Sequence, residues 1–183
     1  MAVYTQLTCA DMQTLLSKYH VGTLAHYEEI SAGIENTNYF VDTLFDHQKG
    51  LIVQNGRHKQ GASVGSGVGK DIQKWVLTIF ENVQSEELPY FCELTNHLSR
   101  DGLNVPAPLE NIEGGYCFEF EGKTGLLVPK LSGESLSVPD DQACKAMGEY
   151  LARMHLSLQD FPRKRKLVRD LAWMTSKALG LKG

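Results

Sequence analysis

The sequence predicts an α+β fold, in which an antiparallel sheet of about five strands is covered by a helix and followed by further helices. Short period-two or continuous apolar runs, typical of strands, recur at 23–30, 38–45, 75–81, 118–121 and 126–131. Helically spaced apolar residues occur at 8–19, 86–101, 140–158 and 170–179. The resulting order of helix, strands, helix, strands and helices fits such a layered lobe.

The first predicted helix, residues 8–19, has a clear start. Thr8 and Asp11 have the spacing of a capping box, and the Asp11 carboxylate suits the positive end of the helix. Its apolar stripe is Met12, Leu15, Leu16 and Tyr19.

The next two strands, 23–30 and 38–45, are joined by a Gly- and Asn-containing turn, and the third, 75–81, is almost entirely apolar. Alternation in the third strand puts Val76, Thr78 and Phe80 on one face and Trp75, Leu77 and Ile79 on the other.

Residues 46–72 form an insertion between the second and third strands. Leu51-Ile-Val53 before an Asn-Gly pair predicts an extra hairpin, and the following Gly-rich stretch predicts a loop.

The spacing of apolar residues predicts the buried faces of two later helices. In the helix predicted over 86–101, Pro89 lies in the first turn, where it is tolerated, and Gly102 ends the helix. The stripe of this helix is Leu88, Phe91, Leu94 and Leu98. The predicted inward residues of 140–158 are Ala143, Met147, Tyr150, Leu151 and Met154. Gly122 to Gly125 is the predicted turn between the last two strands.

Composition bounds the function. The 183 residues suit one domain or part of a larger one, and a net charge of −4 argues against a general nucleic-acid binder. Four separated cysteines without zinc spacing predict reduced, buried thiols in a cytoplasmic protein. No apolar run suits a signal peptide or a membrane span.

Four segments carry a family resemblance: Met-Ala-Val-Tyr-Thr at 1–5, Ile-Ser-Ala-Gly-Ile-Glu-Asn-Thr-Asn-Tyr-Phe-Val at 30–41, Trp-Val-Leu-Thr-Ile-Phe-Glu at 75–81, and Glu-Leu-Pro-Tyr-Phe at 87–91. Together they resemble the amino-terminal part of bacterial homoserine kinases, which share the aminoglycoside/choline-phosphotransferase fold. The resemblance implies a kinase-like nucleotide-binding lobe over 1–131, and a hinge exit with the beginning of an incomplete helical lobe over 132–183.

The resemblance also implies a site for ATP with Mg²⁺. Gly33, Asn36, Thr37 and Asn38 take the place of the glycine-rich phosphate loop of other kinases. Gly permits close approach of the backbone, and the other three offer side-chain donors. By itself, the same turn is equally that of a hairpin with Asx caps.

Three further positions follow from the resemblance. Thr78 stands where most kinases of the superfamily have a Lys or Arg, so it either lines the cleft or is a Thr chosen for β-propensity. Glu93 is near the spacing of the kinase helix glutamate, but without a strand cation it is equally a surface carboxylate. Val128, Lys130 and Leu131 resemble the hinge whose backbone binds the adenine edge.

No catalytic or metal-binding residue is assigned within the chain. The family's His-Gly-Asp motif and its Asn and Asp magnesium ligands are absent, so we expect little turnover. The implied activity is phosphorylation of the homoserine hydroxyl for threonine synthesis. The alternatives are a choline or aminoglycoside kinase, or a non-catalytic nucleotide-binding or interaction remnant.

Overall fold

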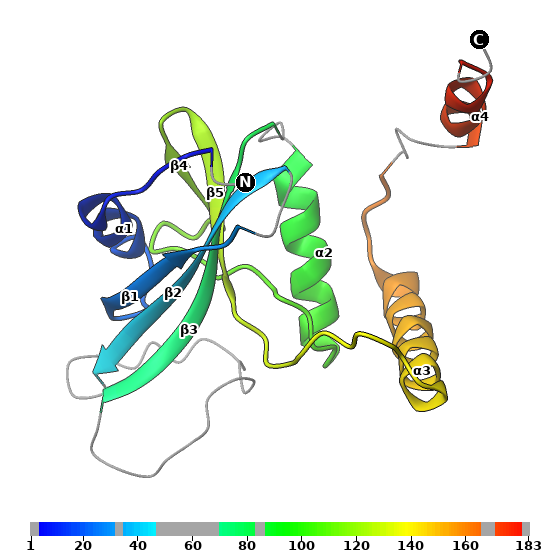
Figure 1. The fold of residues 1–183 in the computed structure, drawn as a ribbon, viewed down its shortest axis with the longest axis horizontal. Helices are drawn as coiled ribbons and strands as arrows, with labels where there is room; N and C mark the ends of the chain where they lie inside the picture. Colours follow the sequence, from blue (N-terminus) through cyan, green and yellow to red (C-terminus); the bar gives the residue numbers. More distant parts are fainter. Residues whose placement is uncertain (1–3, 32–34, 47–69, 83–86, 166–170, 181–183) are drawn as a thin grey trace.

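The computed structural model describes residues 4–31, 35–46, 70–82, 87–165 and 171–180 (Figure 1). Its elements are α1 (Cys9–Leu16), β1 (Thr23–Glu29), β2 (Asn36–Asp46), β3 (Lys70–Phe80), α2 (Leu88–Arg100), β4 (Cys117–Phe120), β5 (Lys123–Pro129), α3 (Asp141–Ser157), the 3₁₀ turn η2 (Leu158–Asp160) and α4 (Leu171–Gly180). No helix in these ranges is both long and apolar enough to cross a membrane.

The predicted five-stranded antiparallel sheet is confirmed, with strand order β1-β2-β3-β5-β4. The β2–β3 pairing runs from Asn36 opposite Phe80 to Asp46 opposite Lys70. β3 therefore begins before the predicted residue 75, because residues 70–74 pair with the end of β2. The predicted hairpin at 51–53 and the Gly-rich loop lie outside the described residues.

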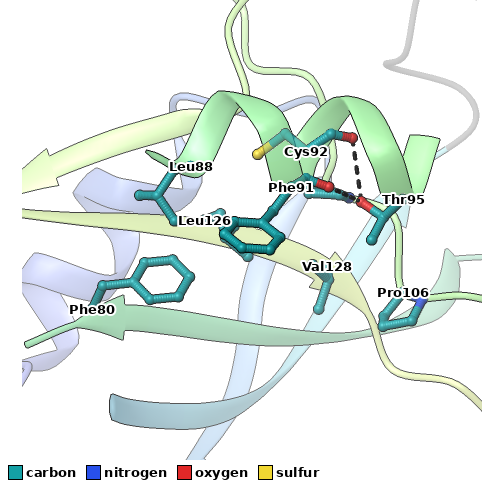
Figure 2. A pocket seen from close by; sticks show the side chains of 9 residues that line it. Phe80, Leu88, Phe91, Cys92, Thr95, Pro106, Leu126 and Val128 are labelled. Atoms are coloured by element: carbon teal, nitrogen blue, oxygen red, sulfur yellow. Dashed lines mark hydrogen bonds between the residues drawn. The ribbon is translucent and has the colours of Figure 1, made fainter. Parts of the chain in front are cut away.

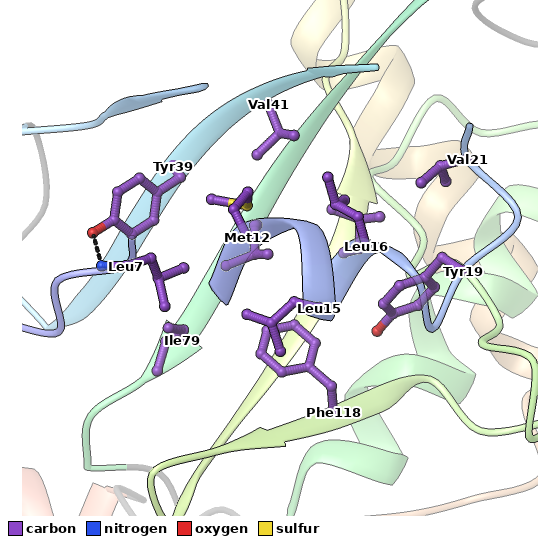
Figure 3. Packing of buried hydrophobic residues seen from close by; sticks show 12 residues of the cluster. Leu7, Met12, Leu15, Leu16, Tyr19, Val21, Tyr39, Val41, Ile79 and Phe118 are labelled. Carbon is purple, nitrogen blue, oxygen red and sulfur yellow. Dashed lines mark hydrogen bonds between the residues drawn. The ribbon is translucent and has the colours of Figure 1, made fainter. Parts of the chain in front are cut away.

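One face of the sheet packs on α1 and forms the hydrophobic core (Figure 3). Met12 and Leu16 of α1 are buried against Val41 of β2 and Ile79 of β3. Burial of each such side chain contributes roughly 1.5–3 kcal/mol. The predicted capping box also forms, because Asp11 N–H donates to the Thr8 hydroxyl and Thr8 N–H donates to the Asp11 carboxylate.

The other face carries α2, so a helix covers each face rather than one face alone (Figure 1). Leu88 and Leu98 are buried as predicted, whereas Phe91 is 39% exposed. Cys92 and Asn96 are buried in its stead, and the Asn96 amide donates to the Cys92 carbonyl oxygen at 2.8 Å. A satisfied amide can therefore occupy a buried position that apolar periodicity does not predict.

The turn between β4 and β5 is shorter than predicted. Glu121 and Gly122 have φ angles of 50° and 74°, which is the backbone of a two-residue hairpin turn. β5 consequently begins at Lys123 rather than at 126.

α3 lies beyond α2 and away from the sheet (Figure 1). Asp140 caps it by accepting from Ala143 N–H at 2.7 Å. The prediction that Met147 and Leu151 point inward is wrong, since they are 59% and 43% exposed. Among the described residues, the hydrogen bonds from α3 to the rest of the fold go to the end of α2 and the chain after it, as in the bond from the Tyr150 hydroxyl to the Asn104 carbonyl at 2.9 Å.

The cysteines differ in burial. The prediction of four buried thiols is wrong for Cys9 and Cys144, which are exposed, whereas Cys92 is buried and Cys117 is half-buried.

Candidate functional site

The candidate site lies on the sheet face opposite α1. In β2, Asn36, Asn38 and Phe40 stand opposite Phe80, Thr78 and Val76 of β3. Residues directly opposite in an antiparallel pair share a face, so these six side chains form one surface. The predicted separation of Val76, Thr78 and Phe80 from buried Leu77 and Ile79 is thereby confirmed.

Asn38 and Thr78 are joined across this surface. The Thr78 hydroxyl donates to Asn38 Oδ1 at 2.7 Å, and Asn38 Nδ2 donates to the Asn36 carbonyl at 3.2 Å. These bonds fix the orientation of the Asn38 amide. They put both predicted residues together on the half-buried, open face rather than in the core.

Asn36 carries an unpaired polar atom. Its Oδ1 is buried and has no hydrogen-bond partner within the described ranges. A buried acceptor left unpaired costs about 1–3 kcal/mol, so a donor at this position would be favourable. Gly33, the fourth predicted loop residue, lies outside the described residues.

The predicted hinge is only partly available for a ligand. The Lys130 N–H donates to the Lys74 carbonyl at 2.9 Å, so this amide is occupied by β3. Backbone groups alternate in direction along a strand, so the Pro129 carbonyl points away from β3, and the Leu131 N–H is the next amide beyond it. Among the described backbone groups, neither has a partner.

The side chains around the hinge add an aromatic surface and a cation. Lys130 Nζ lies 3.6 Å from the centre of the Phe40 ring, which is a cation–π contact. Val128 stands opposite Val76 on the same face. Phe40, Val76 and Val128 thus give an apolar floor with one positive charge above it.

An apolar pocket of about 190 Å³ adjoins this face, between α2 and the sheet (Figure 2). It is lined by Phe80, Leu88, Phe91, Cys92, Thr95, Pro106, Pro108, Leu126 and Val128. The Thr95 hydroxyl donates back to the Phe91 and Cys92 carbonyls. The pocket therefore offers apolar contact rather than free polar groups.

A family model described as the phosphotransferase enzyme family, APH, matches residues 26–181. The chain belongs to this phosphotransferase family.

Homoserine kinases are among its relatives. The chain is 35% identical to those of Ralstonia nicotianae and Cupriavidus metallidurans over 173 residues, and 33% identical to that of a Janthinobacterium species over 178 residues. These matches cover 94%, 94% and 97% of this chain but 45%, 46% and 47% of the relatives. The chain therefore spans about half the length of the curated relatives it matches.

A solved structure has the same fold. Spectinomycin phosphotransferase, determined with ADP and spectinomycin, matches with a TM-score of 0.57 at 12% identity, covering 97% of this chain and 48% of that protein.

Two residues predicted from the resemblance lie apart from the open face of the sheet. Thr37 is fully buried on the α1 face, where its hydroxyl donates to Glu81 at 2.6 Å and accepts from the Tyr4 and Thr5 amides. Glu93 lies outside the pocket lining and pairs with Arg163 at 2.8 Å. Thr37 faces α1 because side chains alternate between the two faces along β2, and its neighbours Asn36 and Asn38 are on the open face. Glu93 directly follows Cys92, which faces the sheet, so Glu93 points in a different direction from the helix.

Sequence reasoning missed the polar cluster around Thr37. Lys123 Nζ lies 2.5 Å from Glu81 and 2.6 Å from the Thr5 hydroxyl, on the face away from the candidate site. Burial raises the pKa of Glu81, but hydrogen bonds from Lys123, Thr37 and Thr5 outweigh it and hold the pKa below its usual value. The sequence signal for this position of Glu81 is that it continues the every-second-residue pattern of Leu77 and Ile79, which face α1.

The described ranges contain no group of three or more His, Cys, Asp or Glu that could hold a metal ion.

Proposed function

We propose that this chain is the ATP-binding lobe of a homoserine kinase, spanning residues 1–131, with residues 132–183 beginning a second, helical lobe. The observation that carries the proposal is the open face centred on the Asn38–Thr78 pair. The 35% identity to homoserine kinases supports the choice of acceptor and a cytoplasmic setting.

The proposed roles follow from chemistry. Phe40, Val76 and Val128 give the apolar surface that a purine ring prefers, and the pocket beside them extends it. The Pro129 carbonyl and the Leu131 N–H supply an acceptor and a donor for the base edge. Asn36 and Asn38 form the phosphate side together with Gly33, which is included from the sequence alone, and Lys130 places a cation over the Phe40 ring on the apolar side.

Phosphoryl transfer depends mainly on positioning and charge neutralisation. This chain supplies positioning of the nucleotide. The proposal assigns no general base and no Mg²⁺ ligand to this chain, whose described residues contain no group of three or more His, Cys, Asp or Glu that could hold a metal ion.

Calorimetric titration of the 183-residue chain with ATP tests the lobe. We expect saturable one-to-one binding that Val76→Arg abolishes and that Thr14→Ala, at an exposed position of α1, leaves unchanged. Retained folding of both variants is checked by circular dichroism. No saturable binding by the wild-type chain would refute the proposal.

A chimera tests whether this lobe serves a homoserine kinase. This chain replaces the matching half of the Ralstonia nicotianae homoserine kinase, and phosphorylation of homoserine is measured. We expect the activity to be retained. A folded, ATP-binding chimera that does not phosphorylate homoserine would overturn the homoserine assignment while leaving the lobe assignment intact.

A further inference from the structure

The chain that follows α3 runs along α2, from the end of that helix back toward its start (Figure 1). At the end of α2, the His97 ring donates to the Ser157 carbonyl at 2.9 Å. At the start of α2, the Arg165 guanidinium donates to the Glu87 carboxylate at 2.6 Å. Residues 157–165, called the strap below, therefore span the helix.

Between these two ends, the strap contacts α2 through a ring and a charge. The Phe161 ring lies 5.8 Å from the Tyr90 ring and 5.3 Å from the His97 ring, centre to centre. Arg163 pairs with Glu93 at 2.8 Å. On α2 the contacted residues are three or four positions apart, so they lie on one side of the helix. They are Glu87, Tyr90, Glu93 and His97.

The strap reaches the candidate site through Phe91. The Arg165 guanidinium lies 4.9 Å from the centre of the Phe91 ring, which is a cation–π contact. Phe91 is 39% exposed and lines the apolar pocket between α2 and the sheet (Figure 2). Phe80 and Val128, which belong to the open sheet face, line the same pocket. Phe91 thus stands between the strap and the surface proposed for the nucleotide.

Glu93 has a different partner from the strand cation of other kinases. In protein kinases, a strand lysine pairs with a helix glutamate, and this pair must be in place for activity. Here the strand position holds Thr78, whose hydroxyl is bonded to Asn38, and Glu93 is paired with Arg163. The cation that meets this helix carboxylate therefore comes from the segment after α3 and not from the sheet.

We propose that the strap is a clamp that positions α2 for nucleotide binding. Arg163 and Arg165 hold the two α2 carboxylates, and Arg165 also holds the Phe91 ring at the pocket. The two arginines are positioning residues, because they act on the nucleotide through α2 rather than by touching it. The effect on ATP rests on the proposed function, whereas the clamp itself does not.

The clamp is weak enough to be released without unfolding the chain. The side chains of the Arg163–Glu93 pair are 51% and 41% exposed, and those of the Arg165–Glu87 pair are 33% and 43% exposed. Ion pairs at such exposure contribute little to global stability. The hydrophobic core on the other face of the sheet includes, among the described residues, none from α2 or the strap. Loss of the clamp should therefore loosen α2 while the sheet stays folded.

Hydrogen–deuterium exchange of the 183-residue chain without ATP tests the clamp. In Arg163→Ala/Arg165→Ala, we expect peptides of α2 to exchange at least about threefold faster, while peptides of β2 and β3 keep their rates. Lys145→Ala/Lys164→Ala is the matched control, since it also removes two exposed cations, one of them from the strap, and it should exchange like the wild-type chain. Arg163→Glu should loosen α2 as well. Glu93→Arg/Arg163→Glu restores an ion pair and should recover the wild-type rates.

ATP titration of the same variants separates positioning from mere docking of the strap. We expect ATP affinity to fall about threefold in Arg163→Ala/Arg165→Ala, to stay unchanged in the control and to recover in Glu93→Arg/Arg163→Glu. If the double-alanine variant fails to fold by circular dichroism, Arg163→Glu and the swapped pair decide.

Each other outcome counts against a stated part of the proposal. Wild-type exchange of α2 in the double-alanine variant, or no recovery on swapping the charges, would overturn the clamp. Faster exchange of α2 with unchanged ATP affinity would overturn its positioning role. A wild-type chain that binds no ATP would refute the proposed function together with that role, and the exchange rates would still decide the clamp.

Discussion

Thr78 of β3 donates a 2.7 Å hydrogen bond to the side-chain carbonyl of Asn38 on β2, at the centre of the open sheet face. The family resemblance implies that Thr78 stands where most kinases of the superfamily carry a strand cation. The bond orders a neutral polar pair there, and nucleotide binding on this face is accordingly expected to depend on hydrogen bonds more than on a strand charge.

Thr78→Val removes the donor and leaves Asn38 Oδ1 without its partner. We expect the free energy of unfolding to fall by about 1 kcal/mol and ATP affinity to fall about three- to tenfold. Thr78→Ser keeps the hydroxyl and should retain both properties. Urea unfolding and calorimetric titration measure the two effects, and equal behaviour of the Val and Ser variants would contradict a role for the hydroxyl.

Lys123→Met tests the cluster on the other face. Glu81 has only 8% of its side chain exposed, so loss of the Lys123 ammonium leaves a nearly buried carboxylate without its counter-charge. We expect the free energy of unfolding to fall by about 2 kcal/mol. This is less than the cost of breaking a fully buried ion pair, because Lys123 is 32% exposed and solvent screens its charge. ATP affinity should stay unchanged, since the cluster lies away from the candidate site. A large affinity loss would contradict that separation.

The pH dependence of stability follows from Glu81. Its pKa is lower in the folded chain than the ordinary value of 4.5, so the folded state binds fewer protons than the unfolded state in this range. The contribution is complete above pH 4.5 and is lost as the pH falls through the folded pKa. Urea midpoints from pH 7 to pH 3 should fall more steeply for the wild-type chain than for Glu81→Gln. Parallel curves would show that other carboxylates cause the fall.

Alternating and helical periodicity predicted the five strands and the helices because each element buries one face against a layer. The same alternation correctly separated Thr78 from Leu77 and Ile79. The same alternation also places Thr37 on the buried face, because Thr37 is two residues before buried Tyr39 and four before buried Val41. The family resemblance indicated the loop as a whole, whereas strand register decides which of its residues are on the open face.

Contacts between distant segments were not predictable in this way. Lys123 and Glu81 meet because a two-residue turn brings the start of β5 beside the end of β3, which depends on a turn length that the Gly122–Gly125 pattern did not specify. Cys92 and Asn96 are buried, and Phe91 is exposed, because α2 presents to the sheet a face one residue away from its predicted apolar stripe. Both features depend on the tertiary arrangement.

The exposed apolar side of α3 predicts dye binding. Met147 and Leu151, one turn apart on the same side of α3, are 59% and 43% exposed, and they offer an apolar surface to a fluorescent hydrophobic probe. We expect binding under native conditions and at least a twofold lower signal in Met147→Gln/Leu151→Gln. An unchanged signal in this variant would locate the dye elsewhere, with the apolar pocket beside α2 as the next candidate.

Gly125→Ala tests the closest approach in the sheet. A β-carbon there would lie 2.3 Å from the Phe118 ring and 2.7 Å from the Thr78 carbonyl oxygen, and the second contact is with backbone that cannot rotate away. Phe118 is buried in the core, so relief requires repacking it, and we expect a loss of about 3 kcal/mol in urea unfolding. Gly148→Ala is the matched control, because a β-carbon there meets no atom within 4 Å and α3 is exposed, so that stability should rise or stay level.

Equal effects of the two substitutions would show that β5 shifts to accommodate the methyl group. In that case Thr78, whose carbonyl it would meet, would also move, and ATP affinity should fall in Gly125→Ala alone.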